Sequence, residues 1–481
     1  MYSFIAGIIL LIAGYFTYGK FVEKVFGVKK ERQTPAYTHK DGVDYLPMNT
    51  KKNSLIQLLN IAGVGPIFGP IMGALYGPVA FLWIVLGCIF AGAVHDYLTG
   101  MISIRNRGAH LPELAGKFLG SFMKHVVNAF AILLLLLVGT VFVTSPAGLL
   151  HNLMNGWMSM GLILGAIFIY YILATLLPID KIIGRFYPIF GALLLISALG
   201  VGASLIISGA PIPEINLTNM HPDNAPIFPL LFLTISCGAL SGFHATQTPI
   251  ISRTTENEDQ GRKIFYGMMI AEGVIAMIWA AAAMSLFNGS AGLNELLAAG
   301  GPAAVVSEAS KLTLGAVGGT LAVLGVIVLP ITSGDTAFRS ARMIIADYIR
   351  FGQQKLGNRL VIALPLFVIS FALTKIDFEI LWRYFSWANQ STAVIALWVA
   401  SMYLFIARKN YWIAMIPGIF MTMATVTYIL NAKIGFGLSM NISYLGAAIA
   451  TVIITVLFYN AAGKARKNNI ALEEDITGRV A

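Results

Sequence analysis

Charged residues are scarce in this sequence. They make up 11% of its 481 residues, whereas a soluble domain carries about 25%. A chain of this length cannot cover a water-exposed surface with so few charges, which excludes an ordinary cytosolic enzyme and a disordered scaffold. Cysteine is also scarce: only Cys88 and Cys237 occur, and both lie in apolar runs. We therefore exclude a disulfide-rich secreted protein and expect both cysteines to be core residues.

Long apolar runs are what the sequence has instead, since 57% of its residues are hydrophobic. A membrane crossing needs about 20 apolar residues. The sequence predicts an all-α, polytopic membrane protein with about 13 transmembrane helices. The predicted spans are 2–22, 54–76, 78–104, 121–146, 158–177, 185–208, 226–251, 263–288, 312–347, 359–374, 377–407, 411–430 and 440–461.

The basic residues indicate how these spans are oriented. Lys and Arg accumulate in cytoplasmic loops, and with the N-terminus outside, 28 of the 32 fall on the inner side. The first span is followed by Lys20 and Lys24 and preceded by no basic residue, so we interpret it as a retained helix and not as a signal peptide. The net charge of +10 then marks a cytoplasmic face and gives no reason to expect nucleic acid as a partner. We expect a multi-pass membrane protein with its N-terminus outside and its C-terminus in the cytoplasm.

Two of the predicted spans are interrupted. The second contains Gly and Pro around Gly63–Pro66, and the seventh contains the polar stretch Ser241–Pro249. The glycines from Gly65 to Gly77 also recur every fourth residue, which favours close helix packing. Broken helices at matching places in two halves indicate the central site of a transporter. They lie five spans apart and so run in opposite directions, which predicts a LeuT-like inverted five-plus-five repeat of the APC superfamily.

This architecture divides the chain into four units. We expect an N-terminal helix and cytoplasmic loop (1–53), a first repeat (54–208), a second repeat (209–407), and two C-terminal helices with a cytoplasmic tail (408–481). The substrate would bind between the two breaks and against the eleventh span. The candidate substrate-binding residues are Asn60, Gly63, Gly65, Pro66, Phe243, His244, Gln247, Trp387, Asn389 and Gln390.

Ionisable and hydroxyl residues at membrane depth are candidates for ion coupling, because their burial is costly. The candidates are Thr332, Ser333, Asp335, His95 and Asp96. An Asp335–Arg339 pair at i,i+4 is the structural alternative for Asp335. Arg383 has Glu379 one turn earlier as its partner, and Glu272 has no local partner. Coupling would use a proton on Asp335, His244 or the His95/Asp96 pair, or Na⁺ near Thr332 and Ser333, and we expect H⁺ in preference to Na⁺. We expect no cofactor and no bound metal, a metal held by His95, Asp96 and His244 being the weaker alternative.

Five stretches of the sequence resemble one family, the carbon starvation protein A family. They are NIAGVGPIFGPIMGALYGPVA (60–80), AGAVHDYLTGM (91–101), SGFHATQTP (241–249), ITSGDTAFRSARMIIAD (331–347) and YFSWANQSTA (384–393). The resemblance implies a prokaryotic inner-membrane transporter associated with peptide uptake during nutrient limitation, a stress response. Related members that share these motifs import pyruvate with protons.

The function expected from these observations is secondary active import of a small carboxylate-bearing nutrient, with peptides as the leading candidate and pyruvate as the alternative. An intramembrane aspartyl hydrolase built on Asp96 and Asp335 is the alternative of a different class. Ser333-Gly334-Asp335 does not match the Gly-x-Gly-Asp pattern of such proteases, so we expect no enzyme. The expected partners are the substrate and the lipid bilayer, and the sequence leaves the oligomeric state open.

Overall fold

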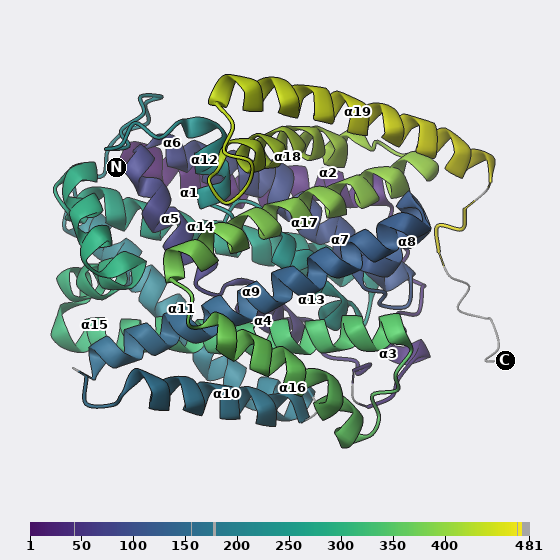
Figure 1. The fold of residues 1–481 in the computed structure, drawn as a ribbon, viewed down its shortest axis with the longest axis horizontal. Coiled ribbons are helices and arrows are strands. Elements are labelled where there is room, and N and C mark those ends of the chain that lie inside the picture. The colour runs from purple at the N-terminus through teal and green to yellow at the C-terminus, as the bar shows by residue number, and fades with distance from the viewer. Residues whose placement is uncertain (43, 155, 177–178, 469, 474–481) are drawn as a thin grey trace.

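The structure, a computed structural model, describes residues 1–42, 44–154, 156–176, 179–468 and 470–473. Within these residues it contains helices and no strand, apart from an isolated bridge between Met48 and Thr255. The long helices lie side by side along the longest axis of the molecule (Figure 1). The expected all-α class is therefore confirmed for the described part of the chain.

The α-helices begin and end as follows. In chain order they are α1 (Tyr2–Phe16), α2 (Tyr18–Phe26), α3 (Pro35–Thr38), α4 (Thr50–Ile61), α5 (Gly65–Gly73), α6 (Val79–Leu82), α7 (Ala93–Arg105), α8 (Leu111–Leu119), α9 (Ser121–Leu153), α10 (Met160–Leu176), α11 (Ile179–Ile207), α12 (Ile227–Thr234), α13 (Gly242–Ser252), α14 (Gly267–Leu286), α15 (Gly289–Ile349), α16 (Leu356–Leu373), α17 (Phe378–Ile406), α18 (Trp412–Asn431) and α19 (Met440–Lys467). Short 3₁₀ helices at Ala74–Tyr76 and Glu258–Gln260, and π-helical segments at Trp83–Gly92 and Arg262–Tyr266, connect or extend them.

The number of membrane crossings is partly supported. Among the described residues, nine helices are long and apolar enough to cross a membrane, or ten if the bent pair α4–α5 counts as one crossing. Each predicted span coincides with a helix or a pair of helices. However, α10 has 17 residues, α12 and α13 are short, and α11 follows residues outside the described ranges. Thirteen crossings therefore remain a prediction.

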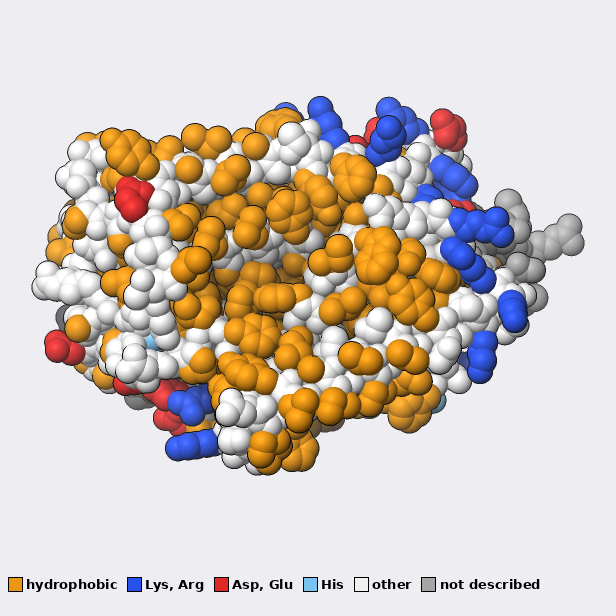
Figure 2. Space-filling model, turned by 90° about the horizontal axis from the view of Figure 1, so that it is seen from above, with side chains coloured by type: hydrophobic (Ala, Val, Ile, Leu, Met, Phe, Trp, Pro, Cys, Tyr) orange, Lys and Arg blue, Asp and Glu red, His pale blue; other side chains and the backbone are white. Residues whose placement is uncertain are grey.

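The surface of the molecule is apolar where a membrane would surround it. Figure 2 shows a broad band of hydrophobic side chains, with Lys and Arg concentrated at one end. The termini of the described helices lie toward opposite ends, with Met1 at one and the end of α19 at the other (Figure 1). The interior holds the buried polar residues, while α16 and α19 expose large apolar side chains. This arrangement is what a hydrocarbon solvent requires.

The first predicted break is present close to the expected place. Helix α4 ends at Ile61 and α5 begins at Gly65, and the two axes are bent by 47°. Gly65 and Pro66 therefore start the second half of the broken helix. Proline is well placed there, because the first turn of a helix has no internal acceptor for its N–H groups.

The second break exists, but the predicted position is wrong. Residues Gly242–Ser252 are helical, and the chain is unwound at 235–241, just before them. The hydroxyls of Thr246 and Thr248 bond to carbonyls of their own helix, so the polarity of this stretch does not require unwinding. The unwound segment instead contains Gly238 at φ +86°, a conformation that an L-residue rarely adopts.

The two breaks touch each other. A side-chain carbon added at Gly65 would lie 2.5 Å from both Cβ and Sγ of Cys237, which is closer than atoms can approach. Glycine at 65 is therefore what lets the start of α5 approach the unwound segment. The two interrupted spans therefore meet at this contact.

Candidate functional site

A buried polar cluster lies beside the second break, and we call it the His244 cluster. Its members are His95, Asp96, Cys237, His244 and Glu272, all buried. Asp96 accepts at both carboxylate oxygens, with His95 Nδ1 at 2.8 Å from Oδ1 and His244 Nδ1 at 2.8 Å from Oδ2. The sequence had given no reason for His95 and Asp96 to touch, and the structure shows that they do.

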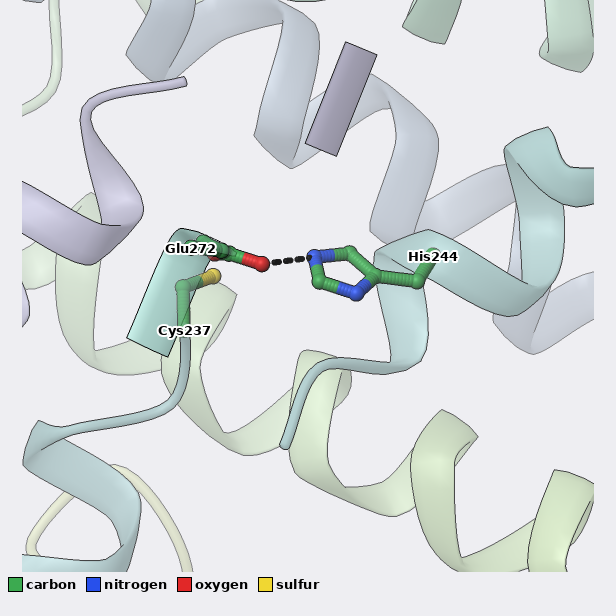
Figure 3. Close-up of side chains that lie close together, drawn as sticks. All are labelled: Cys237, His244 and Glu272. Atoms are coloured by element: carbon green, nitrogen blue, oxygen red, sulfur yellow. Dashed lines mark ion pairs between the residues drawn. The ribbon is translucent and has the colours of Figure 1, made fainter. Parts of the chain in front are cut away.

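The other side of His244 faces Glu272. His244 Nε2 lies 3.4 Å from Glu272 Oε2, and the thiol of Cys237 completes a group whose ligand atoms all lie within 4.8 Å of one another. Figure 3 shows the imidazole on α13 pointing at the carboxylate on α14, with Cys237 beside it on the unwound segment. Three separate elements thus bring these side chains together.

The second break is held by amide side chains from α17. Asn389 Oδ1 accepts from the backbone N–H of Phe243 at 2.7 Å, and Gln390 Nε2 donates to the carbonyls of Phe232, Ser236 and Leu240. Glu272 Oε1 accepts from the N–H of Gly238. An unsatisfied backbone group in a membrane interior costs several kcal/mol, so these amides stabilise the unwound segment.

The first break is joined to the second by another chain of polar residues. Asn60 on α4 donates to Gln247 on α13 at 3.4 Å, and Gln247 donates to Gln57 at 3.1 Å. Thr336 on α15 donates to Asn60 at 2.9 Å. The predicted residues Asn60 and Gln247 are therefore in contact, across 187 positions of sequence.

Helix α15 passes beside the first break. Ser333 Oγ donates to the carbonyl of Leu59 at 3.0 Å, whereas Thr332 Oγ1 donates to Leu329 on its own helix. Asp335 is fully buried, and Arg339 Nη2 lies 3.9 Å from its Oδ1. Neither carboxylate oxygen of Asp335 has a hydrogen-bond donor within the described residues. The i,i+4 pair is thus present but leaves the carboxylate poorly solvated.

The predicted residues do not all belong to this site. Phe243 lies at the start of α13 and packs against Phe142, and Gly63 lies near Phe142 and Ser333. Trp387 instead packs against Phe130 of α9 and is only half-buried.

Arg383 pairs with Glu379 at 3.4 Å, but both side chains are exposed, by 54% and 77%. That ion pair is a weak latch at most.

The sequence missed Cys237 and gave Glu272 no role. Cys237 stood in an apolar run and Glu272 had no local partner, so neither carried a local signal. A lone carboxylate in an apolar span was the one available clue, because such a residue faces a partner from another helix. Asp96 pairs with His95 and His244, whereas Asp335 pairs with Arg339, so the two carboxylates have separate partners.

Cavities enter from both ends of the molecule. One of about 440 Å³ lies at the end that carries Met1 and reaches Thr234 and Ser386, next to the second break. One of about 580 Å³ is more polar and reaches Arg253, just after the end of α13. Helix α13 has 11 residues, a rise of about 16 Å. The buried polar residues lie between these two cavities.

Fold and site together define an all-helical membrane protein in which two helix breaks meet beside buried polar side chains. A crystal structure of a mutant manganese transporter from Eremococcus coleocola matches with a TM-score of 0.57 and 12% sequence identity, covering 86% of this chain and 94% of that chain. At this identity the match shows the shared fold alone.

Sequence comparison gives the family. The family described as carbon starvation protein CstA matches residues 1–165, 151–301 and 287–428, and the chain belongs to it. The peptide transporter CstA of Escherichia coli is 25% identical over 578 aligned residues, covering 90% of this chain and 82% of that protein. The pyruvate/proton symporter BtsT of the same organism is 25% identical over 342 residues, covering 57% and 47%. An uncharacterized membrane protein of Haemophilus influenzae is 51% identical over 343 residues, covering 60% and 92%.

Proposed function

We propose that this protein is a secondary active transporter that imports a small carboxylate-bearing nutrient by alternating access. The observation that carries the proposal is the contact of two helix breaks at Gly65 and Cys237, surrounded by buried polar side chains. Unwound backbone at membrane depth is tolerated where it lines a binding cavity or is buried in protein. Peptides are the first candidate substrates and pyruvate the second, in line with the names of the relatives.

The helix ends at the breaks suit a carboxylate. Helices α5 and α13 both begin at a break, at Gly65 and Gly242. The N-terminus of a helix carries a partial positive charge and attracts anions. We place the substrate carboxylate between these two ends, with Asn60 and Gln247 as its polar neighbours.

We propose H⁺ as the coupling ion and Asp335 as its carrier. Its carboxylate is buried with a single cation at 3.9 Å and no hydrogen-bond donor in the described residues, so binding a proton would relieve an unfavourable charge. Asp96 is less suited, because two imidazole nitrogens already bond to it at 2.8 Å. Na⁺ bound near Thr332, Ser333 and the carbonyls of the first break is the alternative.

The two cavities support alternating access. The cavity of about 440 Å³ reaches the second break from one end, and the polar cavity of about 580 Å³ reaches Arg253 from the other. The polar residues between them are buried. We propose that the first cavity opens to the outside of the cell. The chain would cross the inner membrane thirteen times, with its N-terminus outside and its C-terminus in the cytoplasm. Residues 54–208 and 209–407 would form a LeuT-like inverted repeat.

Uptake into proteoliposomes tests the function and the substrate. The purified protein is reconstituted, and a dipeptide, a tripeptide and pyruvate are each offered with an inward H⁺ gradient, an inward Na⁺ gradient, or neither. We expect concentrative uptake of one substrate class with the H⁺ gradient alone. Uptake with the Na⁺ gradient alone would assign Na⁺, and uptake that ignores both gradients would contradict coupling. Counterflow in the absence of gradients separates a transporter from a channel.

A further inference from the structure

We infer that Cys237, His244 and Glu272 form a binding site for a divalent metal ion of the Zn²⁺ class. The three residues come from the unwound segment, α13 and α14, and all are buried. They offer a thiol sulfur, an imidazole nitrogen and a carboxylate oxygen, all within 4.8 Å of one another (Figure 3). Thiolate, imidazole and carboxylate together are the donor set that Zn²⁺ prefers, and three protein ligands leave a fourth position open.

Two of the three ligand atoms have no hydrogen-bond partner. His244 Nε2 and Glu272 Oε2 are buried, and neither forms a hydrogen bond within the described residues. They face each other at 3.4 Å. In a tetrahedral zinc site with bonds of about 2.1 Å, nitrogen and oxygen ligands lie about 3.4 Å apart. The separation of these two atoms therefore already fits a bound ion.

The neighbours of His244 orient it as a ligand. Asp96 Oδ2 lies 2.8 Å from His244 Nδ1, so the carboxylate holds the proton of the ring on Nδ1. In the neutral ring this leaves the lone pair on Nε2, which faces Glu272 Oε2 at 3.4 Å. A carboxylate behind the imidazole is the usual support of a zinc-bound histidine, and it raises the basicity of the ligand.

Charge balance also favours a cation here. Asp96 and Glu272 are both fully buried, and their ion-pair partners in the described part of the chain are histidines and no Lys or Arg. Two carboxylates without a fixed cation are unstable in an apolar interior. A divalent ion at Cys237, His244 and Glu272 would offset most of this charge, leaving one net negative charge when Cys237 binds as its thiolate.

Cys237 has to move slightly to bind. Ideal sulfur-to-ligand separations at Zn²⁺ are about 3.6 Å, compared with the limit of 4.8 Å for this group. The thiol donates to Ser241 Oγ at 3.3 Å, and it would exchange that bond for the ion by moving its side chain, while Asn389 and Gln390 keep the backbone of the unwound segment in place. Gly65, which packs against Cys237, has no side chain that the cysteine would have to displace.

Cobalt titration of the purified full-length protein tests the site. The protein in detergent is stripped of metal with a chelator, titrated with Co²⁺ and then with Zn²⁺. We expect one Co²⁺ per chain with a thiolate-to-cobalt charge-transfer band, displaced by one equivalent of Zn²⁺. A wild-type protein that shows no such band overturns the proposal.

Substitutions locate the ion. Cys237→Ser should remove the charge-transfer band, and the near-isosteric Glu272→Gln should weaken Zn²⁺ binding at least about tenfold. Asp96→Asn should weaken it by about 10–100-fold, as expected for a residue behind a ligand. Cys88→Ser is the matched control, since Cys88 is the other buried free cysteine and donates to Met269.

The outcomes distinguish this site from the proposed transport. A band that survives in Cys237→Ser, or one that is lost in Cys88→Ser, contradicts the assignment. Gel filtration and helical circular dichroism report whether each variant folds. If Cys237→Ser does not fold, the near-isosteric variants Glu272→Gln and Asp96→Asn still test the site. Metal binding is measured without substrate or ion gradient. A protein that transports but binds no metal would contradict the metal site alone, and a protein that binds metal but does not transport would contradict the proposed function alone.

Discussion

The two helix breaks differ in how their backbones are supported. The first break is short, at 62–64, and α15 approaches it with the hydroxyl of Ser333 and the poorly solvated carboxylate of Asp335. The second is longer, at 235–241, and the amides of Asn389 and Gln390 occupy its backbone groups. The first break thus lies near a carboxylate, Asp335, that a proton or cation could neutralise. The backbone of the second break is instead held by the side chains of Asn389 and Gln390. We expect substitutions near the first to change coupling and substitutions near the second to change stability.

Replacing Asp335 should have the largest effect. Asp335→Asn removes the proposed proton carrier while keeping the size of the side chain, so concentrative uptake should fall to the level of empty liposomes. Counterflow should continue, because the substrate site is unchanged. Both are measured with labelled substrate in proteoliposomes.

The matched control for Asp335 is Glu295→Gln, which removes an exposed acid from the first segment of α15, before the non-helical residues Gly300, Gly301 and Gly315, and should leave uptake unchanged. Normal gradient-driven uptake by Asp335→Asn would show that the proton is carried elsewhere. Loss of counterflow together with uptake would instead assign Asp335 to substrate binding or folding.

Removing an amide from the second break should destabilise the protein. Asn389→Leu leaves the N–H of Phe243 and the hydroxyl of Ser241 without their acceptor. A buried polar group without a partner costs about 1–3 kcal/mol, so the Tm in detergent should fall clearly. Thr392→Val, three residues further along α17, removes a hydroxyl that bonds only within that helix and should change Tm little. Equal Tm values for the two variants would refute the scaffold role.

The contact between the breaks can be tested with a pair of substitutions. Gly65→Ala places a carbon 2.5 Å from Cβ and Sγ of Cys237, and overpacking of this kind costs about 1–3 kcal/mol. Cys237→Gly removes both atoms and should relieve that cost, so the two changes should be non-additive in Tm. Gly161→Ala, where the added carbon meets nothing within 4 Å, is the control. Additive effects would mean that the breaks do not touch.

The smallest effect is expected at the exposed pair of Arg383 and Glu379, which lines the cavity of about 440 Å³. Its side chains are 54% and 77% exposed, so solvent screens their attraction. Arg383→Gln should change stability by less than about 0.5 kcal/mol, read as an unchanged Tm. A large fall in Tm would show that this pair is a structural latch after all.

Much of the fold could be predicted because its signals are local. Apolar runs, the placement of Lys and Arg, and glycine and proline within a span are each read from neighbouring residues. The predicted break at Gly63–Pro66 is found within a residue or two of its place. The second break was misplaced because polar side chains at Thr246 and Thr248 look like unwinding, although they bond to their own helix.

The sequence by itself determined that this chain belongs in a membrane, which spans are interrupted, and which family it joins. Only the tertiary structure decided that His244 meets Asp96 and Glu272, that Cys237 lies against Gly65, and that Trp387 points elsewhere. The physical reason is that membrane insertion depends on the composition of one segment, whereas a buried polar site depends on which faces of separate helices are packed together.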